Sequence, residues 1–319
     1  MKIRKIFKDF IFAESLPGSP AVMDFEPSLF HTVDHLKLQR PNDWLWYNAK
    51  DQKNDRIVAS LYLNVNDHKA SSSIRSPFGT IECSDSFPAD GLFEFLQFVE
   101  ASCKHRNIER IILQDAPAAY APKKSALMST FLINLGYRAT RAEVAACIKV
   151  IGEYEEGLSP GEKPVLQKSR LAGLTYAILP TDKLDVVYEF IAKCHQRKGY
   201  TLSMDFHDLQ RTVFEFPERF VLSCVLDRTQ IVSASVAIKI NTSILYNFYM
   251  DHDATYNQLS PPLMLMEGMF KFCKALNIDL LDLGTSSLDG QPNFSLLAFK
   301  LRTGAFPSPK LRFEKMLSV

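Results

Sequence analysis

The sequence predicts an α+β protein of two domains, in each of which helices flank a mixed, mostly antiparallel β-sheet. Its 319 residues exceed what one small hydrophobic core accommodates. Hydrophobic residues make up 46% and charged residues 23%, which is typical of globular proteins. The same order of predicted elements, a strand pair, a helix and a buried strand, occurs twice along the chain. A duplicated α/β unit explains that order, and we place the domains at residues 1–160 and 161–319.

The first half follows this order with two further elements at its end. β-branched and alternating residues predict a strand pair around a polar turn, and apolar residues at helical spacing predict the helices. The predicted elements are a strand at 57–65, a turn at 66–69, a helix at 90–104, a strand at 108–114, a helix at 124–135 and a strand at 143–150. Residues 152–168 are rich in Gly, Pro and Glu, so they predict a linker.

The second half begins with a helix and then repeats the order. A meander of three antiparallel strands is predicted, and Pro261 and Pro262 mark the start of the helix after it. The predicted elements are a helix at 183–198, strands at 220–226, 231–240 and 244–250, a helix at 263–276 and a buried strand at 278–283.

Charge and cysteine usage exclude several classes of protein. The formal net charge of +1 supplies no general field for a polyanion, so an extensive nucleic-acid surface is disfavoured. No apolar run approaches the roughly 20 residues that cross a bilayer, and no secretory signal precedes the first domain. We therefore expect a cytoplasmic protein. The six cysteines are scattered without metal-ligand spacing, so we expect reduced thiols and no metal.

Four segments of the second half carry a recognisable pattern: Leu245–Tyr249, Ser260-Pro261, Leu281–Ser286 and Phe299–Gly304. Together they resemble the C-terminal half of FemAB-like acyltransferases, a superfamily with two GNAT (N-acetyltransferase-type) folds in tandem. Ser76-Pro77-Phe78-Gly79 and Leu135-Gly136-Tyr137 resemble motifs of the same superfamily in the first half. The resemblance implies two tandem GNAT-like domains and a transferase that acts on a small acyl donor and an amine acceptor.

Three residues are the candidates for catalysis. The resemblance places Lys300 near the substrate channel, where a cation can stabilise an oxyanion or neutralise a phosphate or carboxylate. A solvated lysine or a structural ion pair is the alternative. Asp282 ends a buried apolar run, where a carboxylate needs a partner, so it either binds or deprotonates an amine or caps the following turn. Tyr246 joins them on the neighbouring strand. We expect Lys300 to return on a strand antiparallel to the one that carries Asp282, near the same end of the sheet.

Four more residues are candidates for substrate binding. Strict alternation would point Asn247 and Tyr249 to one face of their strand and Tyr246 to the other. That polar face either lines the cleft or packs against a neighbouring strand. Thr285 and Ser286 follow the buried run at its end, beside the predicted site.

The donor site is predicted at the start of the helix at 263–276. Asn257, Gln258 and Ser260 precede Pro261, and helix N–H groups there would hold an anionic donor, while plain capping by Ser260 is the alternative. The glycine-rich loop by which acetyltransferases hold the pyrophosphate of coenzyme A is absent from both halves. The donor is therefore left open between acyl-CoA and aminoacyl-tRNA.

Three functions follow as hypotheses. The first is transfer of an acyl or aminoacyl group to an amine of a small molecule or cell-wall precursor. The second takes aminoacyl-tRNA as the donor and requires a patch formed by Lys168, Arg170, Lys193, Arg197, Lys198, Lys300 and Arg302. The third is a non-catalytic ligand-binding protein on the same scaffold.

Overall fold

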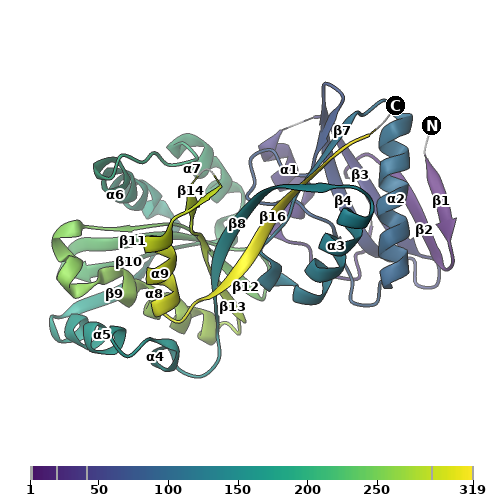
Figure 1. Cartoon of the computed structure of the whole chain (residues 1–319). Helices are drawn as coiled ribbons and strands as arrows, with labels where there is room; N and C mark the ends of the chain where they lie inside the picture. The colour runs from purple at the N-terminus through teal and green to yellow at the C-terminus, as the bar shows by residue number, and fades with distance from the viewer. Residues whose placement is uncertain (1–2, 19–20, 41, 289, 318–319) are drawn as a thin grey trace. The chain divides into compact units, whose positions relative to one another are not determined.

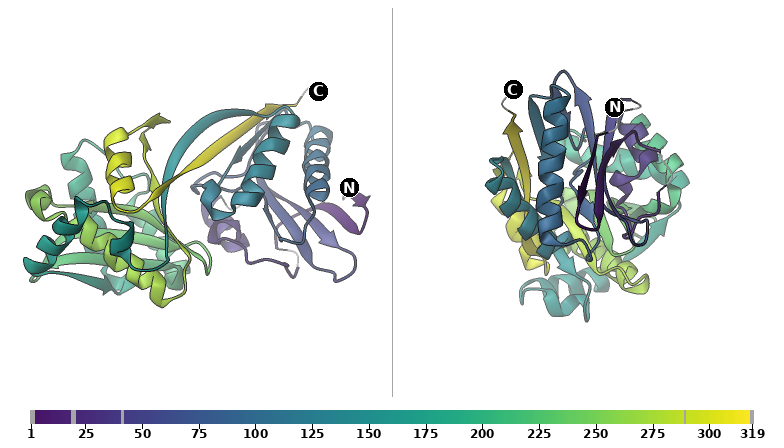
Figure 2. Two further views of the ribbon diagram at one scale, coloured as in Figure 1. Left: turned by 60° about the horizontal axis from the view of Figure 1, so that its bottom comes forward. Right: turned by 90° about the vertical axis from the view of Figure 1, so that its right-hand side faces the viewer.

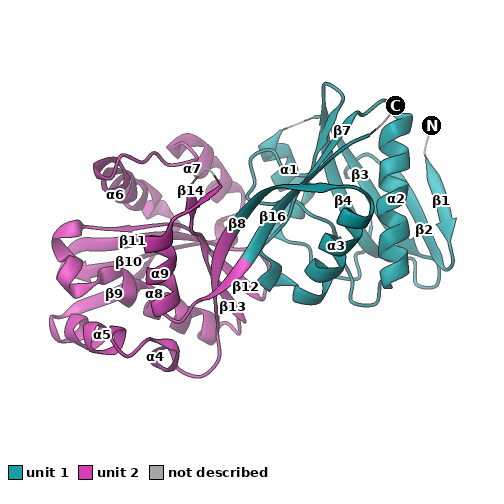
Figure 3. Ribbon diagram, viewed as in Figure 1, with its two compact units in different colours: residues 1–143, 309–319 teal, residues 144–308 magenta. Residues whose placement is uncertain are grey.

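The chain is divided into two units that are not simply its two halves. The computed structural model describes residues 3–18, 21–40, 42–288 and 290–317 (Figure 1). Unit 1 comprises Met1–Glu143 and Pro309–Val319, and unit 2 comprises Val144–Ser308 (Figure 3). The division therefore lies before the predicted boundary at residues 160 and 161, and the last segment of the chain returns to unit 1.

Unit 1 is a mixed sheet with strand order β1-β2-β3-β4-β5-β7-β16-β8, and β6 pairs with β4. Its strands are β1 (Arg4–Phe7), β2 (Phe10–Ser15), β3 (Trp44–Asp51), β4 (Ile57–Asn66), β5 (Lys69–Ser71), β6 (Glu82–Cys83), β7 (Arg110–Gln114) and parts of β8 (Arg138–Lys149) and β16 (Phe306–Met316). Its helices are α1 (Val33–Gln39), α2 (Ala89–His105) and α3 (Pro122–Asn134), with short 3-10 turns at Leu29–His31 and Ala118–Tyr120.

The core of unit 1 lies between its sheet and α2. Leu92, Phe95, Leu96 and Val99 recur every three or four residues, and all four are buried against strands β2 to β4. In Figures 1 and 2, α2 accordingly runs along these strands. The predicted helix at 90–104 is thereby confirmed.

Unit 2 has the strand order β8-β13-β12-β11-β10-β9. Its strands are β9 (Leu174–Leu179), β10 (Phe220–Asp227), β11 (Gln230–Lys239), β12 (Ile244–His252) and β13 (Leu280–Thr285), with a separate hairpin of β14 (Ser287–Leu288) and β15 (Gln291–Pro292). Its helices are α4 (Tyr154–Gly157), α5 (Glu162–Leu171), α6 (Leu184–Arg197), α7 (Phe206–Glu215), α8 (Pro261–Ala275) and α9 (Phe294–Arg302), with 3-10 turns at Thr181–Lys183, Pro217–Arg219 and Ala254–Leu259.

The predicted meander and the crossover after it are confirmed in unit 2. Strands β10, β11 and β12 are antiparallel, and α8 then leads to β13, which pairs with β12 in parallel. Unit 1 repeats this arrangement, because α2 leads to β7, which pairs with β5 in parallel. The predicted linker at 152–168 instead forms α4 and α5, since Tyr154, Leu158 and Leu166 bury their side chains in the core of unit 2.

Each unit is completed by a strand from the other repeat of the sequence. After α3, the chain enters unit 2 along β8, whose Ala145, Cys147, Ile148 and Lys149 pair with β13. After α9, it enters unit 1 along β16, whose residues 312–316 pair with β7. The sheets of the two units therefore exchange their final strands.

Two further expectations concern the whole described chain. All six cysteines are buried and none forms a disulfide. Among the helices in the described ranges, none combines the length and the apolar character that a membrane crossing requires.

Candidate functional site

Lys300 lies in unit 2 on a helix, not on the strand that was expected. The residues from Phe294 to Arg302 favour a helix by intrinsic propensity, and Asn293 Oδ1 caps it by accepting from the Leu296 N–H at 3.1 Å. Only 4% of Lys300 is exposed. Its Nζ donates to the Gly284 carbonyl at 2.9 Å and to the Thr285 carbonyl at 3.0 Å. The helix thus carries the ammonium to the end of β13.

Asp282 is buried within β13, two residues before Gly284, with 1% of its surface exposed. Its Oδ1 accepts from the Gly284 N–H at 2.7 Å, so the carboxylate caps the turn that follows. Capping of this turn was one of the two roles predicted for Asp282. Gly284 adopts a φ of +76°, a backbone conformation that is unfavourable for residues other than glycine. The carboxylate also raises the pKa of the neighbouring Cys147 thiol.

Asp282 is the centre of a row of side chains across three strands. It pairs with Tyr246 of β12 in parallel register and with Cys147 of β8 in antiparallel register. Paired residues of neighbouring strands project from the same face of a sheet, so these three side chains share a face. Lys300, Asp282, Tyr246 and Cys147 are called the Lys300 cluster below. Sequence reasoning missed Cys147, whose one signal was its place in the predicted strand at 143–150.

Burial and neighbouring charge act on Lys300 in opposite directions. Burial lowers its pKa to about 8, although the charge of Asp282 resists that fall. Burial also raises the pKa of the Cys147 thiol far above its usual range, and the Asp282 carboxylate adds to the rise. The thiol therefore stays protonated, and Lys300 is a cation that gives up a proton more readily than an exposed lysine. Such a group can donate a hydrogen bond to a developing oxyanion.

Asn247 and Tyr249 do not share a face, contrary to the alternation that the sequence suggested. The register of β11 and β12 shifts by one residue between the pairs Ala237 with Asn247 and Val236 with Tyr249, which is a β-bulge. Because the bulge reverses the alternation, Tyr249 lies on the face of Tyr246, and Asn247 lies on the opposite face.

Both side chains are held by protein atoms. Asn247 Oδ1 accepts from Ser235 Oγ at 2.7 Å, in the layer that packs against α8. The Tyr249 hydroxyl lies 2.8 Å from Ser203 Oγ and accepts from the Met204 N–H at 2.9 Å. The Tyr249 contacts anchor the segment between α6 and α7, whereas the Asn247 contact joins β12 to β11. Protein groups therefore hold the polar atoms of both side chains.

Thr285 and Ser286 lie beside the Lys300 cluster, and their contacts there are made by backbone atoms. The Thr285 carbonyl accepts from Lys300, and a register shift between β13 and β8 falls between Asp282 and Thr285. Ser286 is fully buried, its N–H donates to the Val144 carbonyl at 2.7 Å, and its Oγ has no hydrogen-bond partner within the described ranges.

The start of α8 offers few backbone donors to an anion. Its first two residues are Pro261 and Pro262, which have no N–H, and the Leu263 N–H already bonds to the Ser260 carbonyl. The predicted capping by Ser260 is wrong, because this residue has a φ of +44° and its side chain accepts no cap hydrogen bond. Asn257 bonds to His252 Nε2 at 2.7 Å, and the Gln258 carbonyl accepts from Lys168.

The basic residues that a tRNA surface would require are largely neutralised within unit 2. Five of the seven form ion pairs with carboxylates: Arg170 with Glu155 and Glu267, Lys193 with Glu189, Arg197 with Asp253, Lys198 with Asp251 and Arg302 with Glu162. Lys168 bonds to a carbonyl, and Lys300 is buried. Their surroundings therefore do not favour a polyanion.

Part of this chain is similar in sequence to one protein family. Residues 169–293, which lie within unit 2, match the family model described as an acetyltransferase (GNAT) domain. No curated protein matches the chain by sequence.

Solved structures extend the likeness to nearly the whole chain. FemX has a similar fold with a TM-score of 0.69 at 12% identity, over 92% of this chain and 93% of that one. The C-terminal domain of a putative lysylphosphatidylglycerol synthetase from Agrobacterium fabrum has a TM-score of 0.53 at 10% identity, over 81% of this chain and 80% of that one. L-PGS from Bacillus licheniformis has a TM-score of 0.51 at 13% identity, over 82% of each chain. At the level of the fold, the resemblance to FemAB-like, GNAT-type proteins is confirmed.

Proposed function

We propose that the protein is an acyltransferase that moves an acyl or aminoacyl group to an amine, with unit 2 carrying the chemistry. The observation that supports this most strongly is the buried Lys300 ammonium beside Asp282 at the end of β13, within the segment that matches a GNAT domain.

In the proposed reaction, the acceptor amine attacks the carbonyl carbon of the donor and forms the new C–N bond. Negative charge then develops on the carbonyl oxygen. A lysine ammonium has three N–H groups, and two of those on Lys300 bond to the Gly284 and Thr285 carbonyls. The third donates to the developing oxyanion. When the intermediate collapses, the bond to the leaving group breaks, and the proton lost by the amine balances the charge of that group.

Asp282 acts through Lys300 in this proposal, because its Oδ1 is already engaged by the Gly284 N–H. Its charge resists the loss of the Lys300 proton, and its hydrogen bond to Gly284 fixes the turn that presents both carbonyls. Asp282 is therefore a positioning residue. Tyr246, which is only half-buried, is the member of the row that we place against the substrate.

The donor contacts the turn before α8 through side chains in our proposal. The prolines remove backbone N–H groups there, whereas the exposed Asn257 and Gln258 and the half-buried Ser260 offer amides and a hydroxyl. An aminoacyl donor is favoured by the folds that the chain shares with FemX and with a protein named as a putative lysylphosphatidylglycerol synthetase. The neutralised basic residues of unit 2 weigh against a long tRNA contact.

The test compares Lys300→Met with Lys163→Met, an identical change at an exposed residue of α5. Purified protein is incubated with acetyl-CoA or with aminoacyl-tRNA and a panel of amines, and acylated products are measured by mass spectrometry. Loss of one oxyanion donor should lower kcat by roughly 10²–10³ in Lys300→Met, and Lys163→Met should retain the wild-type rate. Ligand-induced stabilisation without any product would favour the non-catalytic binding protein instead.

A further inference from the structure

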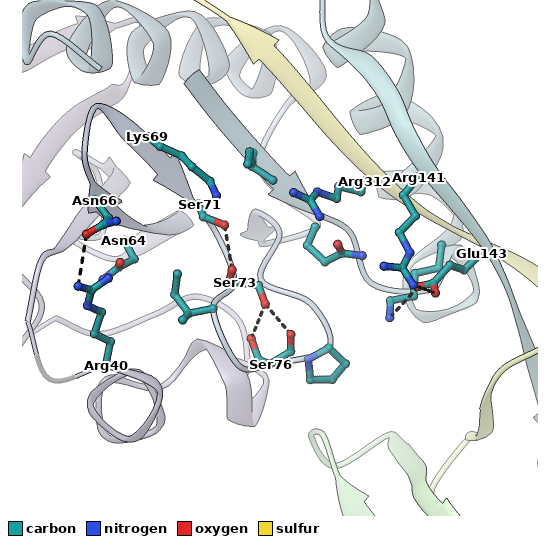
Figure 4. A pocket seen from close by; sticks show the side chains of 15 residues that line it. Arg40, Asn64, Asn66, Lys69, Ser71, Ser73, Ser76, Arg141, Glu143 and Arg312 are labelled. Carbon is teal, nitrogen blue, oxygen red and sulfur yellow. Dashed lines mark hydrogen bonds and ion pairs between the residues drawn. The ribbon is translucent and has the colours of Figure 1, made fainter. Parts of the chain in front are cut away.

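Unit 1 contains a polar pocket of about 440 Å³, which is within the size range of small-molecule sites. Five basic side chains line it: Arg40, Lys69, Arg141, Lys310 and Arg312. Figure 4 shows Arg40 and Lys69 on one side of this pocket, and Arg141 and Arg312 on the other. The cations come from segments far apart in the sequence, so no local motif predicts this pocket.

Among the described residues, the carboxylates that pair with these cations are fewer than the cations. Glu143, which also lines the pocket, is shared between Arg141 at 2.9 Å and Lys310 at 3.7 Å. Glu314 is shared between Arg312 at 3.1 Å and Arg110. The pocket therefore has an excess of positive charge, and gathering like charges costs free energy unless a ligand compensates them.

The floor of the pocket is fixed before any ligand arrives. Gln39 Oε1 accepts from the Ile74 N–H, the Arg75 N–H and Ser76 Oγ, each at 3.2 Å, so one buried amide holds the whole turn. A Cβ on Gly79 would lie 1.9 Å from the Ser72 carbonyl oxygen, so only glycine fits where the turn closes. Ser76 and Pro77 of the motif Ser76-Pro77-Phe78-Gly79 thus line this pocket.

One buried polar atom in the pocket lacks a partner. Asn64 is 1% exposed, and its Nδ2 donates to the Asn42 carbonyl at 3.0 Å. Its Oδ1 has no hydrogen-bond partner among the described residues. An unsatisfied buried acceptor costs free energy, and a ligand that brings an O–H or N–H donor would remove that cost.

We propose that this pocket binds a small phosphate-bearing molecule that also carries an O–H or N–H donor. Guanidinium groups match phosphate oxygens with paired hydrogen bonds, and several cations exceed what a single carboxylate group would neutralise. The hydroxyls of Ser71, Ser73 and Ser76 add further donors for phosphate oxygens. The site rests on unit 1 alone and does not depend on the chemistry proposed for Lys300.

The experiment measures binding of inorganic pyrophosphate to the full chain by isothermal titration calorimetry, with citrate as a carboxylate probe at equal ionic strength. Pyrophosphate should bind saturably, and more tightly than citrate. Arg312→Gln and Lys69→Gln should each weaken it by roughly 10- to 100-fold, the loss expected for a charge-assisted contact. Lys104→Gln changes an exposed cation on α2 outside the pocket and should bind as the wild type does.

Lys69 is exposed, so its substitution tests the site even if Arg312→Gln perturbs folding. Equal binding of citrate and pyrophosphate, unchanged affinity in Lys69→Gln, or no saturable binding would each overturn the proposal. Activity of the Lys300 cluster enters none of these measurements.

Discussion

Units 1 and 2 share a strand order but use positive charge in opposite ways. In unit 2, a single lysine is buried on two carbonyls beside a carboxylate, and burial lowers its pKa. In unit 1, five cations line a pocket, and three of them, Arg141, Lys310 and Arg312, pair with two carboxylates. Burial makes a single cation sensitive to the charge of what it touches, which suits chemistry, whereas several cations that line one pocket suit the capture of an anion. The two units thus arrange their positive charge differently.

The largest expected effect tests whether the units are independent. When the chain is cut after residue 160, the piece 1–160 lacks the part of β16 that pairs with β7, and the piece 161–319 lacks the part of β8 that pairs with β13. Neither piece alone should show a cooperative unfolding transition in urea, followed by circular dichroism.

Mixing the two pieces should restore a cooperative transition, because all strands are then present. A cooperative transition of the piece 1–160 by itself would show that unit 1 does not need its exchanged strand.

The next expected effect is a pH dependence of stability that comes from the buried Lys300 of unit 2. The folded chain holds the pKa of Lys300 at about 8, below its ordinary value of 10.5. Between these two pH values the unfolded chain binds more protons, so the free energy of unfolding should rise with pH across this window. The shift corresponds to about 3 kcal/mol at most. The neutral amine keeps two N–H groups for its two carbonyls, so deprotonation need not break those contacts.

Urea unfolding of the wild type and of Lys300→Met at several pH values between 8 and 10 measures this rise. The two curves should diverge in favour of the wild type as pH increases. Parallel curves would mean that Lys300 is not the buried titrating group, and the contrast between the units would weaken.

A smaller effect is expected at the turn that presents the carbonyls to Lys300. Gly284→Ala should lower the free energy of unfolding by about 1 kcal/mol, because φ at this position is +76°. A Cβ added to Gly161 would have no heavy atom within 4 Å, and φ at this residue is −72°. Gly161→Ala is therefore a suitable control and should leave the free energy of unfolding nearly unchanged. Equal stability of both variants would show that the turn is not under conformational constraint.

The sequence predicted local elements well wherever periodicity reported burial. The helices α2, α6 and α8 and the strands of the meander lie at the predicted residues, because their apolar spacing reflects the faces that they bury. Lys300 was placed near the end of β13 correctly but on a strand, since a short apolar run does not distinguish a helix from a strand.

Long-range features left no readable signal in the sequence. The bulge at Phe248, which separates Asn247 from Tyr249, depends on the register with β11. The segment at 152–168 is polar on average, yet three buried side chains suffice to fold it into α4 and α5. The basic pocket joins residues from Arg40 to Arg312, so only the assembled fold brings them together.

The exchange of final strands also bears on how the protein is made. The ribosome completes β7 long before it reaches β16, and at 5–20 residues per second the interval is roughly 10 to 40 s. Until residues 312–316 emerge, one edge of β7 lacks its partner, and an unpaired strand edge invites pairing with other chains. We therefore expect the nascent chain to need protection at that edge during translation, and synonymous codons that slow the final segment should increase its aggregation.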